Sequence, residues 1–157
     1  MKIGCIQLNM GFGKVEENYE RAEKFIREAA SQGAEIIVLP EMWNTGYALE
    51  KLVELADVNG ERTKAFLSSL AKQLGVHIVG GSVSVKRDDK FYNTMYTFNK
   101  DGELVGEYSK AHLFRLMDEH LYLQAGSEMN RFALGDIEAA GVICYDIRFP
   151  EWLRSHA

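Results

Sequence analysis

The order of short apolar runs and helix-period segments constrains the fold of this chain more than any other sequence feature. The apolar run Lys2–Leu8 precedes apolar residues at helical spacing over Val15–Ala30, and Glu35–Leu39 is a continuous apolar run closed by a proline. A second helical pattern over Phe66–Leu74 leads into the strand-like run Val76–Val85. Because a strand, helix, strand unit places its two strands in parallel, this half of the chain predicts a parallel sheet.

After residue 85 the pattern changes from helix and strand alternation to hairpins. Lys86–Lys90 is a polar turn, Asp101-Gly102 is typical of a tight hairpin, and Pro150 stands where a helix could begin. The strands expected here are Phe91–Asn99, Glu103–Tyr108, Arg131–Leu134 and Glu138–Cys144. The sequence therefore predicts an α/β fold with a mixed sheet, in a single domain over residues 1–157.

Composition and charge exclude several classes of function. Acidic and basic residues are interleaved at a net charge of -5, so no basic stripe is available for nucleic acid. No apolar stretch is long enough for a membrane span or the core of a signal peptide. The two cysteines lie far apart and the four histidines lack metal-ligand spacing. We therefore expect a cytoplasmic protein with two free thiols and no metal, membrane or nucleic-acid partner.

Three side chains with catalytic chemistry stand at the ends of expected strands. Glu41 directly follows Leu39 and Pro40, Lys110 follows the second hairpin strand, and Cys144 ends its apolar run before a turn into the expected helix. Ligands of α/β sheets bind at such strand ends, and a strand-to-helix bend exposes a thiol beside backbone N–H groups. A base, a cation and a thiol nucleophile are therefore expected to converge, with the positive charge favouring the thiolate.

The residues alone leave other interpretations open. Most single Glu and Lys side chains are surface charges, and a cysteine in an apolar strand is usually part of the core. We assign that buried role to Cys5, which lies in the middle of its expected strand. A Cys/His hydrolase that uses His112 or His120 as the base is a second possible mechanism.

Three ordered motifs carry a resemblance to a known family. Val38–Tyr47 contains Glu41, Tyr108–Phe114 contains Lys110, and Gly141–Trp152 contains Cys144. These segments resemble the nitrilase superfamily of carbon-nitrogen hydrolases. The resemblance implies a four-layer α-β-β-α sandwich without a cofactor, and a homo-oligomer. Family members continue beyond the cysteine helix, so we expect this chain to be the N-terminal portion of that sandwich, with the C-terminal part absent.

The resemblance also implies roles for individual residues. The glutamate, lysine and cysteine of the family fall on Glu41, Lys110 and Cys144, and its supporting glutamate falls on Glu119, which precedes Leu123–Gly126. As a mechanism, Glu41 takes the thiol proton and Cys144 attacks the amide carbon.

The remaining expected site residues bind the oxyanion or the substrate. Lys110 and the backbone N–H of Tyr145 are expected to hold the oxyanion, and Tyr47 and Arg148 to bind substrate. A guanidinium suits a substrate carboxylate, although a structural ion pair beneath the nucleophile turn is an equal alternative for Arg148.

The segment Cys144–Glu151 resembles the ω-amidase and deaminated-glutathione amidase branch of the superfamily. The resemblance therefore favours hydrolysis of a small linear amide, such as 2-oxoglutaramate, to an acid and ammonia. A nitrile- or carbamoyl-hydrolysing enzyme and a non-catalytic interaction fragment are the alternatives. With part of the sandwich absent, strands such as Ile36–Leu39 are expected to have one face uncovered.

Overall fold

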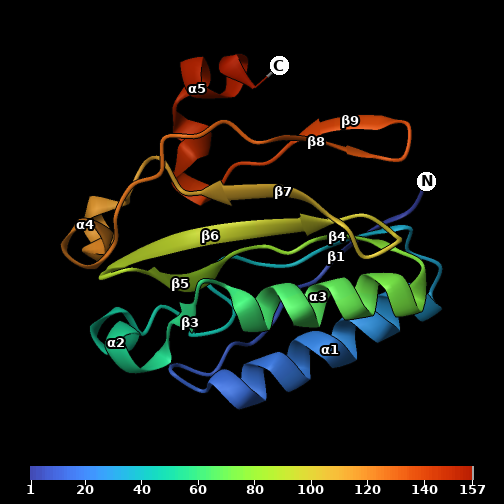
Figure 1. Cartoon of the computed structure of the whole chain (residues 1–157), viewed down its shortest axis with the longest axis horizontal. Helices are drawn as coiled ribbons and strands as arrows, with labels where there is room; N and C mark the ends of the chain where they lie inside the picture. The colour runs from blue at the N-terminus through green and yellow to red at the C-terminus, as the bar shows by residue number, and fades with distance from the viewer. Residues whose placement is uncertain (157) are drawn as a thin grey trace.

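The computed structural model describes residues 1–156, which form a mixed sheet between a pair of helices and a β-hairpin (Figure 1). The seven strands of the sheet are β1 (Ile3–Cys5), β2 (Ile36–Val38), β3 (Asp57–Val58), β4 (His77–Val79), β5 (Val83–Arg87), β6 (Lys90–Phe98) and β7 (Leu104–Ser109). β1, β2 and β4 run parallel, whereas β6 is antiparallel to β4, β5 and β7. The predicted α/β fold with a mixed sheet is confirmed.

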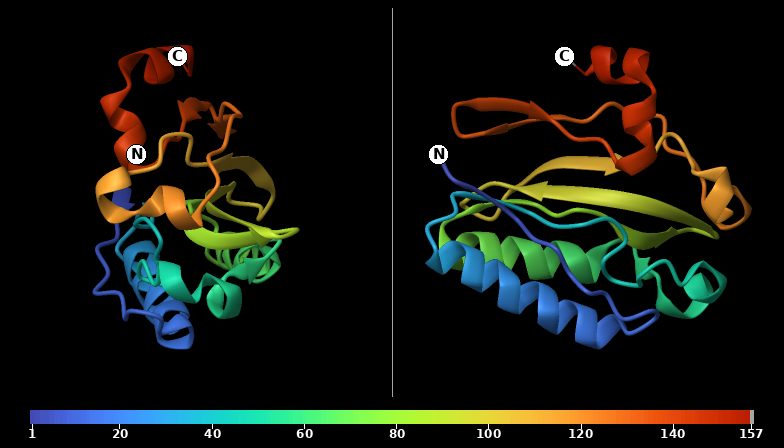
Figure 2. Two further views of the ribbon diagram at one scale, coloured as in Figure 1. Left: turned by 90° about the vertical axis from the view of Figure 1, so that its left-hand side faces the viewer. Right: turned by 180° about the vertical axis from the view of Figure 1, so that it is seen from behind.

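Helices α1 (Val15–Ser31) and α3 (Glu61–Leu74) cover one face of this sheet, as Figure 2 shows from two sides. Apolar residues at helical spacing, among them Ile26 of α1 and Leu67 of α3, have no exposed surface and pack with Ile37 of β2 in the main core. The α3 helix ends at Gly75, which adopts φ +64° and donates its N–H to the carbonyl of Ala71. Hydrophobic periodicity therefore located both helices, although α3 begins earlier than predicted.

A separate hairpin lies over the other face of the sheet. It consists of β8 (Arg131–Leu134) and β9 (Ile137–Ala140), and Phe132 and Leu134 pack on Ile36 of β2. The expectation that Ile36–Leu39 has one face uncovered is therefore wrong, because the β8 side chains cover it.

The predicted strand Val76–Val85 is interrupted. Val79 pairs with Thr97 of β6 and Val83 pairs with Thr94, so four residue steps on one strand match three on the other. Such an extra residue is a β-bulge. It falls where Gly81 approaches the chain next to Glu41, since a Cβ on this glycine would lie 2.0 Å from the Pro40 carbonyl oxygen.

Two expectations about the cysteines' surroundings are wrong. The predicted strand Glu138–Cys144 ends at Ala140, and Cys144 instead begins the 3-10 helix η3 (Cys144–Arg148), which precedes α5 (Pro150–Ser155). Cys5 is exposed, because β1 is an edge strand and its outward side chains are not covered in this structure. Both thiols are therefore accessible.

The short elements around the sheet were not predicted, because a single turn carries too little periodicity to be recognised. They are η1 (Leu49–Lys51), α2 (Leu52–Leu55), η2 (Arg115–Met117) and α4 (Glu119–Tyr122). None of the helices in residues 1–156 is long and apolar enough to cross a membrane.

The bulge at Gly81 gives a stability prediction. Gly81 and Gly75 both adopt positive φ (+57° and +64°), but a Cβ at Gly75 would have no atom within 4 Å. Gly75→Ala should therefore cost on the order of 1 kcal/mol from backbone strain alone. Gly81→Ala should cost clearly more, because Pro40 must also move. Urea denaturation of the two variants would reveal the difference, and equal losses would show that the close approach is unimportant.

Candidate active site

Glu41 stands directly beyond β2, on a loop that the bulge holds in place. Ser82 donates its N–H to the Pro40 carbonyl, accepts from the Trp43 N–H at its own carbonyl, and accepts from the Met42 N–H at its hydroxyl, each at 3.0 Å. The buried Trp43 adds a 2.8 Å bond from its indole nitrogen to the Gly80 carbonyl. These bonds fix the backbone on both sides of Glu41.

Lys110 follows β7 and points its ammonium into the protein. Its Nζ donates to Oε1 of Glu41 and to Oε1 of Glu119, both at 2.8 Å, and the side chain has no exposed surface. A lysine ammonium has three N–H donors, so two are used by these carboxylates and one is left for another acceptor. The structure therefore brings three of the predicted residues into direct contact.

Glu119 begins α4 and is also completely buried. While Oε1 accepts from Lys110, Oε2 accepts from the backbone N–H of Phe114 at 2.7 Å. Glu119 thus joins the ammonium to the loop that follows Lys110, and this geometry suits a supporting position behind Lys110 and Glu41.

Asn93 is a site residue that sequence reasoning missed. It lies in the middle of β6, is fully buried, and donates from Nδ2 to Oε1 of Glu41 at 2.8 Å. Its backbone carbonyl also accepts from the Lys110 N–H at 2.9 Å. In the sequence an asparagine at this position of the run Phe91–Asn99 is indistinguishable from an exposed polar residue, so no local signal could have identified it.

Cys144 is exposed and adopts φ +44°, a conformation that costs a non-glycine residue on the order of 1–3 kcal/mol. Such strain occurs mainly where the surrounding structure fixes a functional group. The thiol lies beside the Glu41 carboxylate, close enough for a hydrogen bond between the two to affect both pKa values. Cys144 therefore lies beside Glu41, although it is not part of the strand in which it was expected.

The protonation states of the cluster follow from its contacts. Burial would raise the pKa of Glu41, but hydrogen bonds from Lys110 and Tyr47 outweigh it and lower that pKa. Burial would lower the pKa of Lys110, but its bonds to Glu119 and Glu41 raise it. At neutral pH these groups are therefore a carboxylate and an ammonium.

The thiol, by contrast, rests in its neutral form. Burial and the negative charge of Glu41 raise the pKa of Cys144, and the opposing effect of Lys110 is smaller. The expectation that the local field favours a thiolate is therefore wrong for the resting protein. A thiolate has to be generated by proton transfer to a neighbouring base, and Glu41 is the ionised base beside it.

The expected substrate-binding residues lie on two sides of Cys144. A groove of about 570 Å³ is lined by Phe114, Leu116, Cys144, Tyr145, Ile147 and Arg148. Arg148 is exposed in this groove and has no carboxylate within 4 Å among residues 1–156, so the alternative of a structural ion pair is not supported there. Tyr145 is the second residue of η3, where backbone N–H groups have no partner within the helix.

Tyr47 lies against the base and not in this groove. Its hydroxyl forms a hydrogen bond with Glu41, and burial together with the Glu41 charge raises the pKa of Tyr47 far above its usual value. It therefore remains a hydroxyl that can donate to the Glu41 carboxylate. This contact gives Tyr47 a place beside the base in addition to the expected role in substrate binding.

The histidine-based alternative finds no support in the geometry. The charged groups that act on the Cys144 thiol are Glu41, Lys110 and Glu119. His112 directs Nδ1 to Asp146 at 2.7 Å and its ring stacks on Phe149, whereas His120 is exposed on α4.

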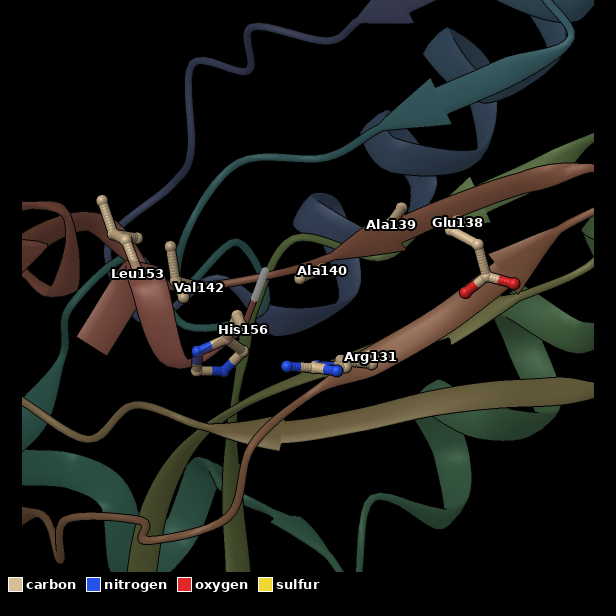
Figure 3. Close-up of a pocket in the computed structure, with 7 residues that line it drawn as sticks. All are labelled: Arg131, Glu138, Ala139, Ala140, Val142, Leu153 and His156. Carbon is tan, nitrogen blue, oxygen red and sulfur yellow. The ribbon is translucent and has the colours of Figure 1, made fainter. Parts of the chain in front are cut away.

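A second cavity, of about 440 Å³, lies between the hairpin and α5 and contains none of the expected site residues. It is lined by Arg131, Glu138, Ala139, Ala140, Val142, Leu153 and His156 (Figure 3). Residues 1–156 contain no cluster of three or more His, Cys, Asp or Glu side chains that could hold a metal ion.

The pairing of Glu41 with the thiol can be tested without any substrate. Glu41→Gln removes the negative charge that raises the pKa of Cys144, so the pH midpoint for alkylation of Cys144 by iodoacetamide should fall. Peptide mass spectrometry would follow both thiols in one sample, and the exposed Cys5 should keep its profile as an internal control. An unchanged Cys144 profile would mean that Glu41 does not act on the thiol.

Comparison with known proteins places this geometry in a family. The family profile described as carbon-nitrogen hydrolase matches residues 2–157. The 2-oxoglutaramate amidase of Bacillus subtilis (strain 168) is 53% identical over 154 residues, which cover 98% of this chain and 59% of that protein. Human omega-amidase NIT2 is 36% identical over 164 residues, covering 99% of this chain and 59% of that protein.

The fold agrees with the sequence comparison. The crystal structure of Saccharomyces cerevisiae Nit3, a member of branch 10 of the nitrilase superfamily, superposes with a TM-score of 0.88 at 29% identity. The match covers 99% of this chain and 59% of that one, so the chain spans about three-fifths of the length of its relatives. The chain belongs to the carbon-nitrogen hydrolase family.

Proposed function

We propose that the protein carrying this chain hydrolyses the ω-amide of a small carboxylic acid, with 2-oxoglutaramate as the first candidate, to a dicarboxylic acid and ammonia. One observation carries the proposal: a buried ammonium, an ionised glutamate and a neutral, accessible thiol meet at one point. That set supplies a nucleophile, its base and a charge for the oxyanion, which is what acyl transfer from an amide requires.

In the proposed acylation step, Glu41 accepts the Sγ proton of Cys144 while Sγ attacks the amide carbon. The carbonyl oxygen becomes an oxyanion, which receives the third N–H of Lys110 and the backbone N–H of Tyr145. When the tetrahedral intermediate collapses, the C–N bond breaks and the protonated Glu41 gives its proton to the departing nitrogen. Ammonia leaves and a thioester remains on Cys144.

The proposed deacylation step uses the same base. Glu41, again a carboxylate, takes a proton from water, and the resulting hydroxide attacks the thioester carbon. The C–S bond breaks, the acid is released, and Glu41 returns its proton to the Cys144 sulfur. The two half-reactions consume one water and regenerate the neutral thiol that the raised pKa of Cys144 favours at rest.

The substrate class is supported by the groove and by the relatives. Arg148 is an unpaired guanidinium within the described residues, in the same groove as Cys144, and guanidinium groups pair bidentately with carboxylates. The names of the Bacillus subtilis and human relatives are 2-oxoglutaramate amidase and omega-amidase. A short amide with a carboxylate at its far end satisfies both observations. The homo-oligomer, the cytoplasmic location and the single incomplete domain stay predictions.

Ammonia release from 2-oxoglutaramate tests the proposal directly. Cys144→Ala should abolish it, whereas Cys5→Ala should leave most of it, because the bonds that join Glu41, Lys110, Glu119 and Asn93 do not involve Cys5. Lys110→Met should lower kcat by about a hundredfold to a thousandfold, the usual cost of losing an oxyanion donor. Lys24→Met, which removes an exposed lysine of α1, is the matched control and should be neutral.

Different measurements test the substrate and the reaction. Arg148→Met should raise KM for 2-oxoglutaramate more than it lowers kcat, because the carboxylate contact is made in both the ground state and the transition state. If Lys110→Met stays within a few fold of wild type, or a nitrile is turned over faster than the amide, the proposed reaction is wrong.

A further inference from the structure

Asp146 is a fully buried carboxylate with four hydrogen-bond donors around it, and it contacts neither Glu41 nor Lys110 directly. Its Oδ2 accepts from the Ile143 backbone N–H at 3.0 Å and from the Tyr108 hydroxyl at 2.7 Å. Its Oδ1 contacts the backbone N–H of His112 at 2.8 Å and the Nδ1 of the same residue at 2.7 Å. A single side chain therefore ties its own turn, at Ile143, to the stretch Tyr108–His112.

These two stretches are the ones that carry the thiol and the ammonium. Ile143 is the residue before Cys144, Tyr108 lies in β7 two residues before Lys110, and His112 lies two residues after it. The strained φ of Cys144 persists only if its neighbours fix the turn, and Asp146 fixes it from within η3. The same carboxylate thus sets the position of the turn relative to the chain on both sides of Lys110.

The contacts behind Asp146 make this link rigid. The Tyr108 hydroxyl donates to Asp146 and accepts from the indole nitrogen of Trp152 at 2.9 Å, which joins α5 to the network. The His112 ring stacks on Phe149 at a centroid distance of 3.6 Å. Because of these contacts, the loop after Lys110 and the turn at Cys144 cannot shift independently of each other. A substitution of Asp146 should therefore change the position of Cys144.

The chemistry of the four donors specifies a carboxylate at this position. Two of the donors are backbone N–H groups, of Ile143 and His112, and they face different oxygens of Asp146. An asparagine would have to place its NH2 group against one of them, whichever way the amide is turned. A buried N–H would then lose its acceptor and meet a second donor, which is unfavourable.

We propose that Asp146 is a positioning residue, which holds the Cys144 turn in register with Glu41 and Lys110 through its bonds to Ile143, His112 and Tyr108. The proposal rests on the proposed function in one respect, that Cys144 is the nucleophile. Asp146 touches neither substrate nor the reacting sulfur. Its effect is exerted through the position of the turn.

The test measures where the thiol lies and not whether the protein turns over substrate. In the wild-type chain the ionisable groups that act on the Cys144 thiol are Glu41, Lys110 and Glu119, with the Tyr47 hydroxyl close by. In Asp146→Asn the turn should move away from Glu41, so the pH midpoint of Cys144 alkylation should fall toward the free-thiol value of about 8.5. Cys5, labelled in the same sample, should keep its wild-type profile.

Two further variants separate positioning from general damage. Asp136→Asn removes a carboxylate from the exposed turn between β8 and β9 and should leave both thiol profiles unchanged. Tyr108→Phe removes one of the four bonds to Asp146 and should shift the Cys144 profile in the same direction as Asp146→Asn, by a smaller amount. If circular dichroism shows that Asp146→Asn does not fold, the shift of the Cys144 profile in Tyr108→Phe becomes the test, and an unchanged profile overturns the positioning role.

The outcomes distinguish this proposal from the proposed function. A folded Asp146→Asn variant with a wild-type Cys144 profile, beside a Glu41→Gln variant whose profile has shifted, would overturn the positioning role and leave the site intact. If neither variant shifts the profile, the assignment of Glu41 as the base for Cys144 fails first. An equal shift of Cys144 and Cys5 in Asp146→Asn would indicate general loosening and would also overturn the positioning role.

Discussion

The ammonium of Lys110 between the carboxylates of Glu41 and Glu119 is the interaction on which the rest of the site depends. A charged group without solvent contact is tolerated only when it is paired, and removing one partner of a buried pair typically costs about 3–5 kcal/mol. Here one cation faces two anions at 2.8 Å each. The three side chains come from the end of β2, the end of β7 and the start of α4, so their pairing constrains how those elements pack. The packing of these elements and the charge balance of the site therefore depend on each other.

The second anion explains the division of roles that we propose. With Glu119 bonded to both Lys110 and the Phe114 N–H, the ammonium stays anchored when Glu41 becomes protonated during acylation. Glu41 in turn accepts from both Lys110 and Asn93 at Oε1, which fixes the position of that oxygen. The neutral thiol beside this anion avoids a third negative charge in the resting site. When the thiol proton passes to Glu41, the negative charge moves from the carboxylate to the sulfur, and the net charge of the site does not change.

Local patterns in the sequence predicted the elements that repeat over many residues. The α1 helix was predicted almost to the residue because its apolar stripe spans several turns, and Glu41, Lys110, Cys144 and Glu119 were placed by motifs that resemble a known family. The bulge at Gly81 was missed because it depends on pairing with β6, and the early end of β9 was missed because its partner β8 begins only at Arg131, which pairs with Ala140.

The residues that hold the site were the hardest to predict. Asn93 and Asp146 act through bonds to segments 52 and 38 residues away in the chain, and nothing in their local sequence distinguishes them from an exposed polar residue. For Cys5 the prediction was wrong in the opposite direction. Its apolar neighbours suggested a buried position, but it is exposed on the edge strand β1. Burial and hydrogen bonding of single polar residues are set by tertiary structure, which periodicity does not report.

The pH dependence of kcat/KM for ammonia release tests the account most directly, because it reports which groups hold the single proton shared by Glu41 and Cys144. Activity needs Glu41 ionised, which holds above its lowered pKa, and Cys144 protonated, which holds below its raised pKa. We therefore expect a plateau whose acid limb lies below about 4.3 and whose alkaline limb lies above about 8.5, the ordinary pKa values of the two groups. An acid limb near 6.5, removed by His112→Ala, would identify a histidine base and contradict the account.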